Sequence, residues 1–326
     1  MEFELIESIR RRTAQSRDDV LLGIGDDAAL LAPPAGHDLV VAVDTLVEGV
    51  HFPVGTAAAD LGWKALAVNL SDLAAMGAAP AWALLALTLP RADTAFVEAF
   101  ADGFAQLARP LRLALVGGDT TRGPLSVTVT VHGLVPHGQA LQRAGAQVGD
   151  AVFVTGVLGD AAAALRCLDR DDARADALLS APPGTRESLL ARLNRPQPRL
   201  ATGAALRGLA SACIDVSDGL LADLGHVCSA SGVGAEIDVD ALPRSSALLT
   251  LFAEDARDFA MAGGDDYELC FTVPAERAAA VAADFSRLDG GATRIGRIVA
   301  GSGVRVHDAE GRTIPAPRRG WDHFRP

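Results

Sequence analysis

The sequence has little positive charge, no long hydrophobic run and a single lysine among its 326 residues. Lys and Arg together number 29 against 41 Asp and Glu, which gives a formal net charge of −12. Because no basic run could neutralise phosphates, the chain is not expected to bind nucleic acid. No stretch of about 18 apolar residues occurs, so no membrane span is expected. The charged N-terminal segment lacks the apolar core of a secretion signal, and we therefore expect a cytoplasmic protein.

Cysteine is also scarce, and its spacing fits no common framework. The four cysteines, Cys167, Cys213, Cys228 and Cys270, form no C-x-x-C pair. This pattern argues against a disulfide scaffold or a zinc site and predicts free thiols in a reducing compartment.

The single lysine excludes two common ways of holding a nucleotide. A P-loop requires the motif G-x-x-x-x-G-K-[ST], and a protein kinase requires a V-A-I-K lysine together with an H-R-D loop. Lys64 lies in LGWKALAV and fits neither motif. Any phosphoryl transfer by this chain must therefore depend on metal ions and arginine.

The chain is long enough for two domains, and 49% of its residues are hydrophobic. Valine-rich runs that end at Gly or Asp alternate with segments of helical period, and the strict alternation of residues 126–135 is typical of an antiparallel strand. We therefore predict an α/β fold with mixed sheets, divided within the polar segment 136–150 into domains 1–140 and 141–326. Strands are predicted at 39–45, 113–121, 126–135, 151–156, 212–219 and 268–273, helices at 60–78, 93–109, 159–168 and 217–230, and a surface loop at 169–188.

Acidic residues recur at turns and strand ends next to glycine. Any single turn Asp is explained equally well by bonds to neighbouring backbone amides. The set is harder to explain in this way, because Asp72 shares with Asn69 one face of an otherwise apolar helix, where a carboxylate needs a partner. The segments are GIGDDAAL (Asp26, Asp27), VAVDTLVEGVHF (Asp44), NLSDLAAMG (Asp72), VGGDTTRG (Asp119), DVSDG (Asp215, Asp218) and AGGDDYEL (Asp265, Asp266, Glu268).

Converging aspartates would repel one another unless a cation joined them. Oxygen ligands without a His/Cys grouping indicate Mg²⁺ or Mn²⁺ rather than zinc, and magnesium commonly bridges to substrate phosphates. The sequence therefore predicts a phosphate-bearing substrate. The Gly-Gly-Asp turns at 117–119 and 263–265 would let backbone approach a phosphate, and Ser217–Gly219, which are predicted to open a helix, would offer it N-terminal amides. A Gly-Gly-Asp alone is more often a simple turn.

The order of these motifs resembles the thiamine-monophosphate kinase family. This family belongs to a superfamily of ATP-binding proteins that includes aminoimidazole ribonucleotide synthetase and selenophosphate synthetase. The resemblance covers residues 1–324, including the tail GWDHF, and the pairing of DTLVEGVHF with GGDDYEL is its most specific part. The resemblance rests on GIGDDAAL, VAVDTLVEGVHF, KALAVNLSDLAAMGAAP, GGDTTRG, DVSDGL and GGDDYEL.

The resemblance implies direct, Mg²⁺-assisted transfer of the γ-phosphoryl group of ATP to thiamine monophosphate, giving thiamine diphosphate and ADP. It implies a homodimer in which the sheet of the N-terminal domain joins that of a second subunit in a barrel. ATP would lie between the N-terminal ATP- and Mg²⁺-binding domain and the C-terminal α/β domain.

The resemblance also implies roles for individual residues. Positions 42 and 43 differ from relatives that have hydroxyl residues there, so Ala42 and Val43 could offer a metal only backbone carbonyls. The other Mg²⁺ ligands would be Asp27, Asp44, Asp72, Asp119, Asp215 and Asp218. Nucleotide contacts would be Gly118, Asp119, Arg143 and Ser217, substrate contacts His51, Glu268 and either Trp321 or Phe324, and catalytic residues Asp44, Asp72, Asp119 and Arg143.

Structural explanations exist for several of these residues. His51 could be an ordinary core histidine, Glu268 could cap the start of a strand, and Arg143 could be a solvated surface residue. Two alternative functions also stay open: another ATP-using reaction of the superfamily, or a nucleotide- and metal-binding regulatory protein without turnover.

Replacing Asp72 tests the metal cluster. We predict that Asp72→Asn abolishes turnover but keeps the fold, because the change removes a metal ligand and preserves side-chain volume. Steady-state kinetics and circular dichroism measure the two effects. Near-normal activity in this variant would remove Asp72 from the cluster.

Overall fold

The computed structural model describes residues 2–168, 181–286, 288 and 290–315. The chain divides into two compact units. Unit 1 comprises residues 1–73 and 78–140, and unit 2 comprises residues 74–77 and 141–326. Among the described residues, no helix is both long and apolar enough to cross a membrane.

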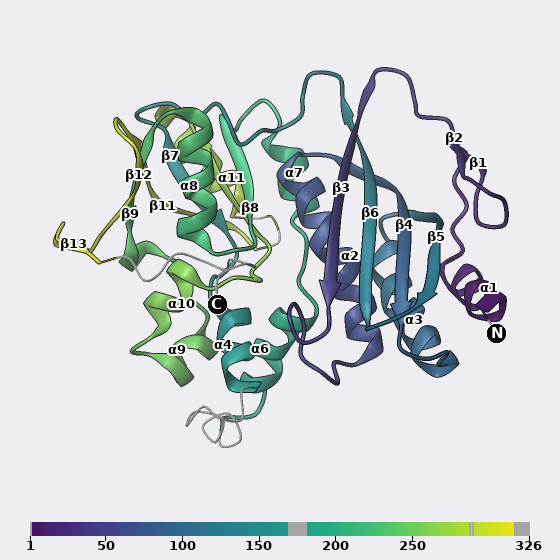
Figure 1. The fold of residues 1–326 in the computed structure, drawn as a ribbon. Helices are drawn as coiled ribbons and strands as arrows, with labels where there is room; N and C mark the ends of the chain where they lie inside the picture. Colours follow the sequence, from purple (N-terminus) through teal and green to yellow (C-terminus); the bar gives the residue numbers. More distant parts are fainter. Residues whose placement is uncertain (1, 169–180, 287, 289, 316–326) are drawn as a thin grey trace. The chain divides into compact units, whose positions relative to one another are not determined.

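Unit 1 is built on a four-stranded mixed sheet (Figure 1). The strand order is β3-β6-β4-β5, with β3 and β4 antiparallel to β6 and β5 parallel to β4. Every inward residue of β6 is buried and its outward neighbours are half-buried, which explains the alternation seen in the sequence. The strands are β3 (His37–Val47), β4 (Ala79–Leu89), β5 (Ala114–Arg122) and β6 (Ser126–Pro136), and the short strands β1 (Val20–Leu22) and β2 (Leu30–Leu31) pair with each other.

Helices α2 (Ala58–Ala75) and α3 (Thr94–Ala108) pack closely against each other within unit 1. Asp93 caps α3 by accepting a hydrogen bond from the Phe96 N–H. The two helices approach at glycines: a Cβ on Gly62 would lie 2.0 Å from the Phe100 carbonyl oxygen, and one on Gly103 would lie 1.8 Å from that of Ala59. The N-terminal helix α1 (Glu2–Thr13) joins α3 through an ion pair between Arg12 and Asp102.

The outward side of β3 carries apolar residues. Leu39, Val41 and Val43 alternate along this edge strand and are 48%, 54% and 58% exposed. Alternation of this kind places all three side chains on one face of the sheet. The strand therefore presents an apolar stripe on the surface of unit 1.

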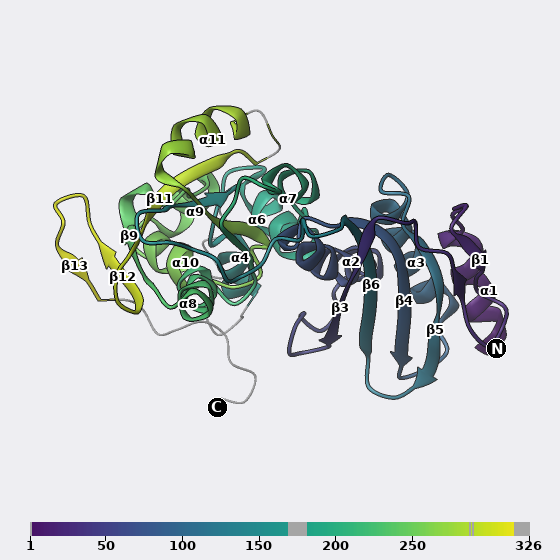
Figure 2. The same cartoon turned by 90° about the horizontal axis from the view of Figure 1, so that it is seen from above.

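Unit 2 contains a seven-stranded sheet in the order β13-β12-β9-β11-β7-β10-β8. Strands β7, β8 and β10 are buried along their whole length, because helices cover both faces of the sheet: α8 lies on one side and α11 on the other (Figure 2). The strands are β7 (Ala151–Thr155), β8 (Ala212–Val216), β9 (Gly234–Asp238), β10 (Glu268–Val273), β11 (Ala292–Val299), β12 (Gly303–His307) and β13 (Thr313–Ile314). The helices are α4 (Asp160–Leu168), α6 (Thr185–Asn194), α7 (Leu200–Leu206), α8 (Leu220–Ser231), α9 (Ser246–Phe252), α10 (Ala256–Ala262) and α11 (Ala278–Phe285).

The structure confirms a mixed α/β fold with mixed sheets. The predicted helix over 217–230 begins three residues later, at Leu220, because residues 217–219 form a turn that holds functional candidates. The prediction of a loop over 169–188 is wrong at its end, where Thr185 begins α6 and Leu189 is buried. Residues 169–180 lie outside the described residues.

The contact between α2 and α3 predicts opposite effects for two helical glycines. We expect Gly103→Ala to destabilise the protein by about 1–3 kcal/mol, because the new methyl group overlaps the Ala59 carbonyl. As a control, Gly225→Ala in α8, where nothing lies within 4 Å, should stabilise by up to about 1 kcal/mol through helix propensity. Urea unfolding measures both changes, and equal effects would contradict the close contact.

Candidate functional site

Two acidic turns of unit 2 lie side by side. Strands β8 and β10 are antiparallel, with Val216 opposite Glu268, so the turn after β8 meets the turn before β10. The Asp265 N–H donates to the Ser217 carbonyl, and the Tyr267 N–H donates to the Val216 carbonyl, both at 2.8 Å. The DVSDG and GGDDYEL motifs, separated by nearly fifty residues of sequence, therefore form one structural feature.

A buried carboxylate that the sequence analysis did not single out organises the first of these turns. One oxygen of Asp223, Oδ2, accepts hydrogen bonds from the backbone N–H groups of Ser217, Asp218 and Gly219, each at 3.1 Å. Asp223 is 3% exposed. Its burial, followed by the charges of Asp215 and Asp218, raises the pKa of Asp223 to about 8. Three carboxyl groups thus lie close enough to influence one another.

This donor set suits a hard divalent cation. The carboxylates are oxygen ligands, and a cation would offset the charges of Asp215 and Asp218, which add to burial in raising the pKa of Asp223. Within the part of the chain that the structure describes, however, no three His, Cys, Asp or Glu side chains form a group that could hold a metal ion. The metal roles of Asp215 and Asp218 remain predictions.

In unit 1, the buried side chain of Asn69 links α2 to β3. Its Oδ1 accepts a hydrogen bond from the Asp44 N–H at 2.9 Å, and its Nδ2 donates to the Ala65 carbonyl. Asp44 is half-buried, and so is Asp72, which lies one turn beyond Asn69 on α2. Ala42 lies on the same side of β3 as Asp44, whereas the Val43 side chain points to the exposed side.

The remaining sequence-predicted residues of unit 1 lie in turns or on strand β5. Asp27 is exposed in a turn where its N–H donates to Asp26 Oδ1, and Asp119 is exposed on β5. Gly118 has a packing reason to be glycine, since a Cβ there would lie 1.8 Å from the Leu85 carbonyl oxygen of β4. His51 accepts a hydrogen bond at Nδ1 from the Val47 N–H (3.0 Å), so Nε2 carries the proton of the neutral ring.

The other predicted contact residues are two positions of unit 2 and two aromatic residues of the tail. Arg143 is exposed, as the surface explanation would have it, and its carbonyl accepts a hydrogen bond from Ser231 Oγ. Ser217 is half-buried in the turn held by Asp223. Trp321 and Phe324 lie outside the described residues.

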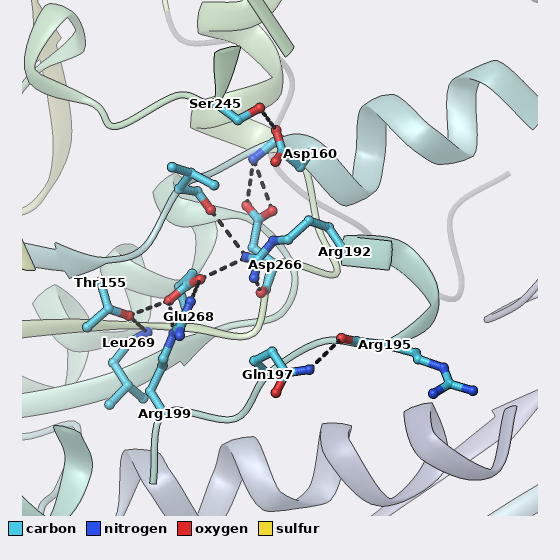
Figure 3. Close-up of polar contacts among 12 residues, drawn as sticks. Thr155, Asp160, Arg192, Arg195, Gln197, Arg199, Ser245, Asp266, Glu268 and Leu269 are labelled. Carbon is cyan, nitrogen blue, oxygen red and sulfur yellow. Dashed lines mark hydrogen bonds and ion pairs between the residues drawn. The ribbon is translucent and has the colours of Figure 1, made fainter. Parts of the chain in front are cut away.

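Glu268 lies in a buried ion triad (Figure 3). Its carboxylate is fully buried and receives two hydrogen bonds from Arg199, at 2.7 and 2.6 Å, and one from Arg192 at 2.8 Å. The Thr155 hydroxyl donates a fourth at 2.6 Å. No pattern in the sequence points to these partners, because Arg192, Arg199 and Thr155 are 69 to 113 residues away from Glu268 in the chain.

Two further buried acids flank this triad. Both carboxylate oxygens of Asp266 accept a hydrogen bond from the Gly159 N–H, and Asp160 accepts one from Ser245 Oγ at 2.6 Å. Burial raises the pKa of Asp266 well above its ordinary value, and burial also raises the pKa of Asp160. Both carboxyl groups are therefore harder to ionise in the folded state than in water.

Comparison with known proteins assigns the family. Residues 25–135 match the family model "AIR synthase related protein, N-terminal domain", and residues 147–309 match the corresponding C-terminal domain. The thiamine-monophosphate kinase of Salmonella typhimurium (strain LT2) is 47% identical over 324 residues, which cover 99% of this chain and 98% of the relative. That of Escherichia coli K12 is 48% identical over the same length, with the same coverage. The chain belongs to the thiamine-monophosphate kinase family.

Solved structures of thiamine-monophosphate kinases agree with this assignment. The enzyme from Stenotrophomonas maltophilia K279a superposes with a TM-score of 0.86 at 56% identity, covering 96% of this chain and 98% of that one. The structure of AaThiL complexed with AMPPCP and TMP superposes with a TM-score of 0.77 at 33% identity, covering 99% of this chain and 97% of that one. The Escherichia coli hydrogenase maturation protein HypE, with a TM-score of 0.76 at 23% identity, shares the fold alone. The resemblance inferred from the motifs, and with it the expectation of an enzyme, is confirmed.

The buried Asp266 predicts how stability changes with pH. Its raised pKa means that, between the unfolded and the folded pKa values, the folded state holds a proton that the unfolded state has lost. The stabilising contribution is therefore complete below the unfolded pKa and declines as pH rises, by at most about 1.4 kcal/mol per pH unit.

Asp266→Asn removes this titration but keeps an oxygen acceptor for the Gly159 N–H. We expect the variant to gain stability relative to the natural protein as pH rises through the interval between the unfolded pKa, about 4, and the raised folded pKa. Urea unfolding at several pH values measures the difference. A stability difference that does not change with pH would show that Asp266 is ionised in both states throughout this range.

Proposed function

We propose that the protein transfers the γ-phosphoryl group of ATP directly to the phosphate of thiamine monophosphate, with Mg²⁺, and releases thiamine diphosphate and ADP. The observation that carries this proposal is the 47–48% identity to thiamine-monophosphate kinases over nearly the whole chain. The structure of AaThiL with AMPPCP and TMP supports it, since AMPPCP is a non-transferable analogue of ATP.

Elementary chemistry explains why such a reaction needs carboxylates rather than a catalytic base. A phosphate acceptor is already ionised near neutral pH, so no group has to remove a proton from it. The obstacle is repulsion between two anions, since unit charges about 4 Å apart interact by roughly 4 kcal/mol at an effective dielectric near 20. Bound Mg²⁺ would supply charge neutralisation and alignment of the phosphates.

The chain offers oxygen ligands for this purpose in both units. In unit 1, Asn69 fixes the backbone at Asp44 beside α2, which carries Asp72. In unit 2, Asp223 fixes the three amides around Asp218. We propose Mg²⁺ ligands at Asp27, Asp44, Asp72, Asp119, Asp215 and Asp218, with the backbone carbonyls of Ala42 and Val43.

We propose that nucleotide and acceptor are held by a second group of residues. Gly118, Asp119, Arg143 and Ser217 would contact ATP. His51, whose ring accepts a hydrogen bond from the Val47 N–H, would contact thiamine monophosphate. An aromatic residue of the tail, Trp321 or Phe324, would pack on the thiamine.

We further propose that the apolar stripe of β3 is covered by a second copy of this chain. Leu39, Val41 and Val43 are about half exposed on an edge strand, where an uncovered apolar stripe invites association. A two-fold dimer places the same strand of each subunit at a shared interface, in agreement with the subunit-spanning barrel that the family resemblance implies.

A product assay tests the activity. Protein incubated with ATP, Mg²⁺ and thiamine monophosphate should yield thiamine diphosphate and ADP in equal amounts, measured by chromatography, and EDTA should stop the reaction. Folded protein that binds ATP without producing ADP in the presence of the acceptor would be a non-catalytic binder, and the kinase proposal would be wrong.

A charge placed in the apolar stripe tests the dimer. We expect Val41→Glu to convert a dimer into a monomer, because a carboxylate buried at the interface would be desolvated without a partner. Sedimentation velocity measures the change. Val148→Glu is the matched control, since Val148 is 62% exposed and belongs to unit 2 rather than to the β3 stripe. A monomeric natural protein, or a dimeric Val41→Glu variant, would contradict the proposal.

A further inference from the structure

We propose that Glu268 is a positioning residue of the nucleotide and metal site and makes no contact with thiamine monophosphate. It holds the turn before β10, and this turn supports the acidic turn after β8. The inference rests on the proposed function and changes the part that Glu268 has in it.

Glu268 has no capacity left for a ligand. A carboxylate offers about four acceptor positions. Oε1 accepts from Arg192 and Arg199, and Oε2 accepts from Arg199 and Thr155. With the residue 0% exposed, a substrate group would have to displace a bidentate guanidinium to reach it.

The surroundings of Glu268 also leave no space. A Cβ on Gly156 would lie 2.1 Å from Glu268 Oε1, so the chain approaches the carboxylate as closely as only glycine allows, and Gly156 has a φ of +56°. The Thr155 hydroxyl donates a hydrogen bond to Glu268. The same hydroxyl oxygen accepts a hydrogen bond from the Leu269 N–H at 2.8 Å. The end of β7 and the start of β10 are thereby locked together.

The turn that Glu268 anchors has a backbone that needs support. Asp265 and Tyr267 have φ values of +67° and +51°, a region that side-chain-bearing residues rarely adopt. Asp266, between them, is held by the Gly159 N–H, and its carbonyl accepts from Arg192 Nη2 at 3.2 Å. Arg192 therefore joins the Glu268 carboxylate to the middle of the turn.

This supported turn reaches the proposed site through two backbone hydrogen bonds. The amides of Asp265 and Tyr267 bond the carbonyls of Ser217 and Val216, at 2.8 Å each. Those two carbonyls belong to residues at the start of the turn whose N–H groups, at residues 217–219, donate hydrogen bonds to Asp223. A loosened turn at 265–267 would therefore displace Ser217 and Asp218, which we assign to ATP and Mg²⁺.

Removing the charge of Glu268 should loosen the turn. In Glu268→Gln one carboxylate oxygen becomes an NH₂ group that faces an arginine donor, and the two guanidiniums lose their negatively charged partner. Thr155→Val removes one hydrogen bond to Glu268 from a residue that is itself 0% exposed, so no ligand can touch it. Thr155→Ser keeps the hydroxyl and serves as the matched control.

Hydrogen exchange followed by mass spectrometry tests the positioning role without reference to activity. In the full-length protein we expect peptides covering 263–268 and 215–219 to exchange about tenfold or more faster in Glu268→Gln and in Thr155→Val. Thr155→Ser should exchange like the natural protein. Unchanged exchange at 215–219 in both variants would overturn the proposal, whatever the activity. If Glu268→Gln does not fold, Thr155→Val and Thr155→Ser decide the result.

Kinetics of the same variants separate positioning from contact. A positioning role predicts that Glu268→Gln and Thr155→Val both lower kcat/KM for ATP, by about 10- to 100-fold for the former, and raise the Mg²⁺ concentration for half-maximal rate. Thr155→Ser should restore both parameters. A direct contact predicts a raised KM for thiamine monophosphate alone in Glu268→Gln and a normal Thr155→Val, and this outcome would overturn the inference. If the natural protein forms no thiamine diphosphate, the proposed function fails and hydrogen exchange alone decides the positioning role.

Discussion

Burying a carboxylate is the constraint on which the second unit depends. A carboxylate loses its hydration on burial, and the protein must replace it with hydrogen bonds, with a countercharge, or with a proton. Unit 2 uses all three. Glu268 is matched by two guanidiniums, Asp223 by three backbone amides, and Asp266 by one amide together with a raised pKa. Each solution fixes a piece of backbone as well as a charge.

These fixed pieces of backbone explain how flexible turns acquire a defined shape. The turns at 215–219 and 263–267 contain glycines and residues in left-handed conformations, which would sample many states if they were unsupported. Asp223 and the Glu268 triad hold one turn each, and the antiparallel pairing of β8 with β10 joins them. Acidic residues near such turns can therefore be positioned without lying on a helix or strand. In unit 1, Asn69 similarly fixes the backbone at Asp44 by accepting a hydrogen bond from its N–H.

The periodic parts of the fold could be predicted from the sequence. The alternation of 126–135 predicted β6, and the apolar period of 60–78 predicted α2, because each pattern reports its own local geometry. The motifs, taken in their order along the chain, also identified the family. The partners of Glu268 could not be predicted, since Thr155, Arg192 and Arg199 reach it only through the packing of strands far apart in the chain. Asp223 was missed because its importance lies in three amides that only the folded turn brings together.

The central claim is that the acidic turns exist to hold a divalent cation together with a polyphosphate. Calorimetric titration of AMPPCP into the natural protein, in the presence of Mg²⁺ and again in EDTA, tests this most directly. The account predicts a saturable heat with Mg²⁺ and none with EDTA, because the carboxylates repel an unaccompanied triphosphate. Equal affinity in both solutions would contradict it.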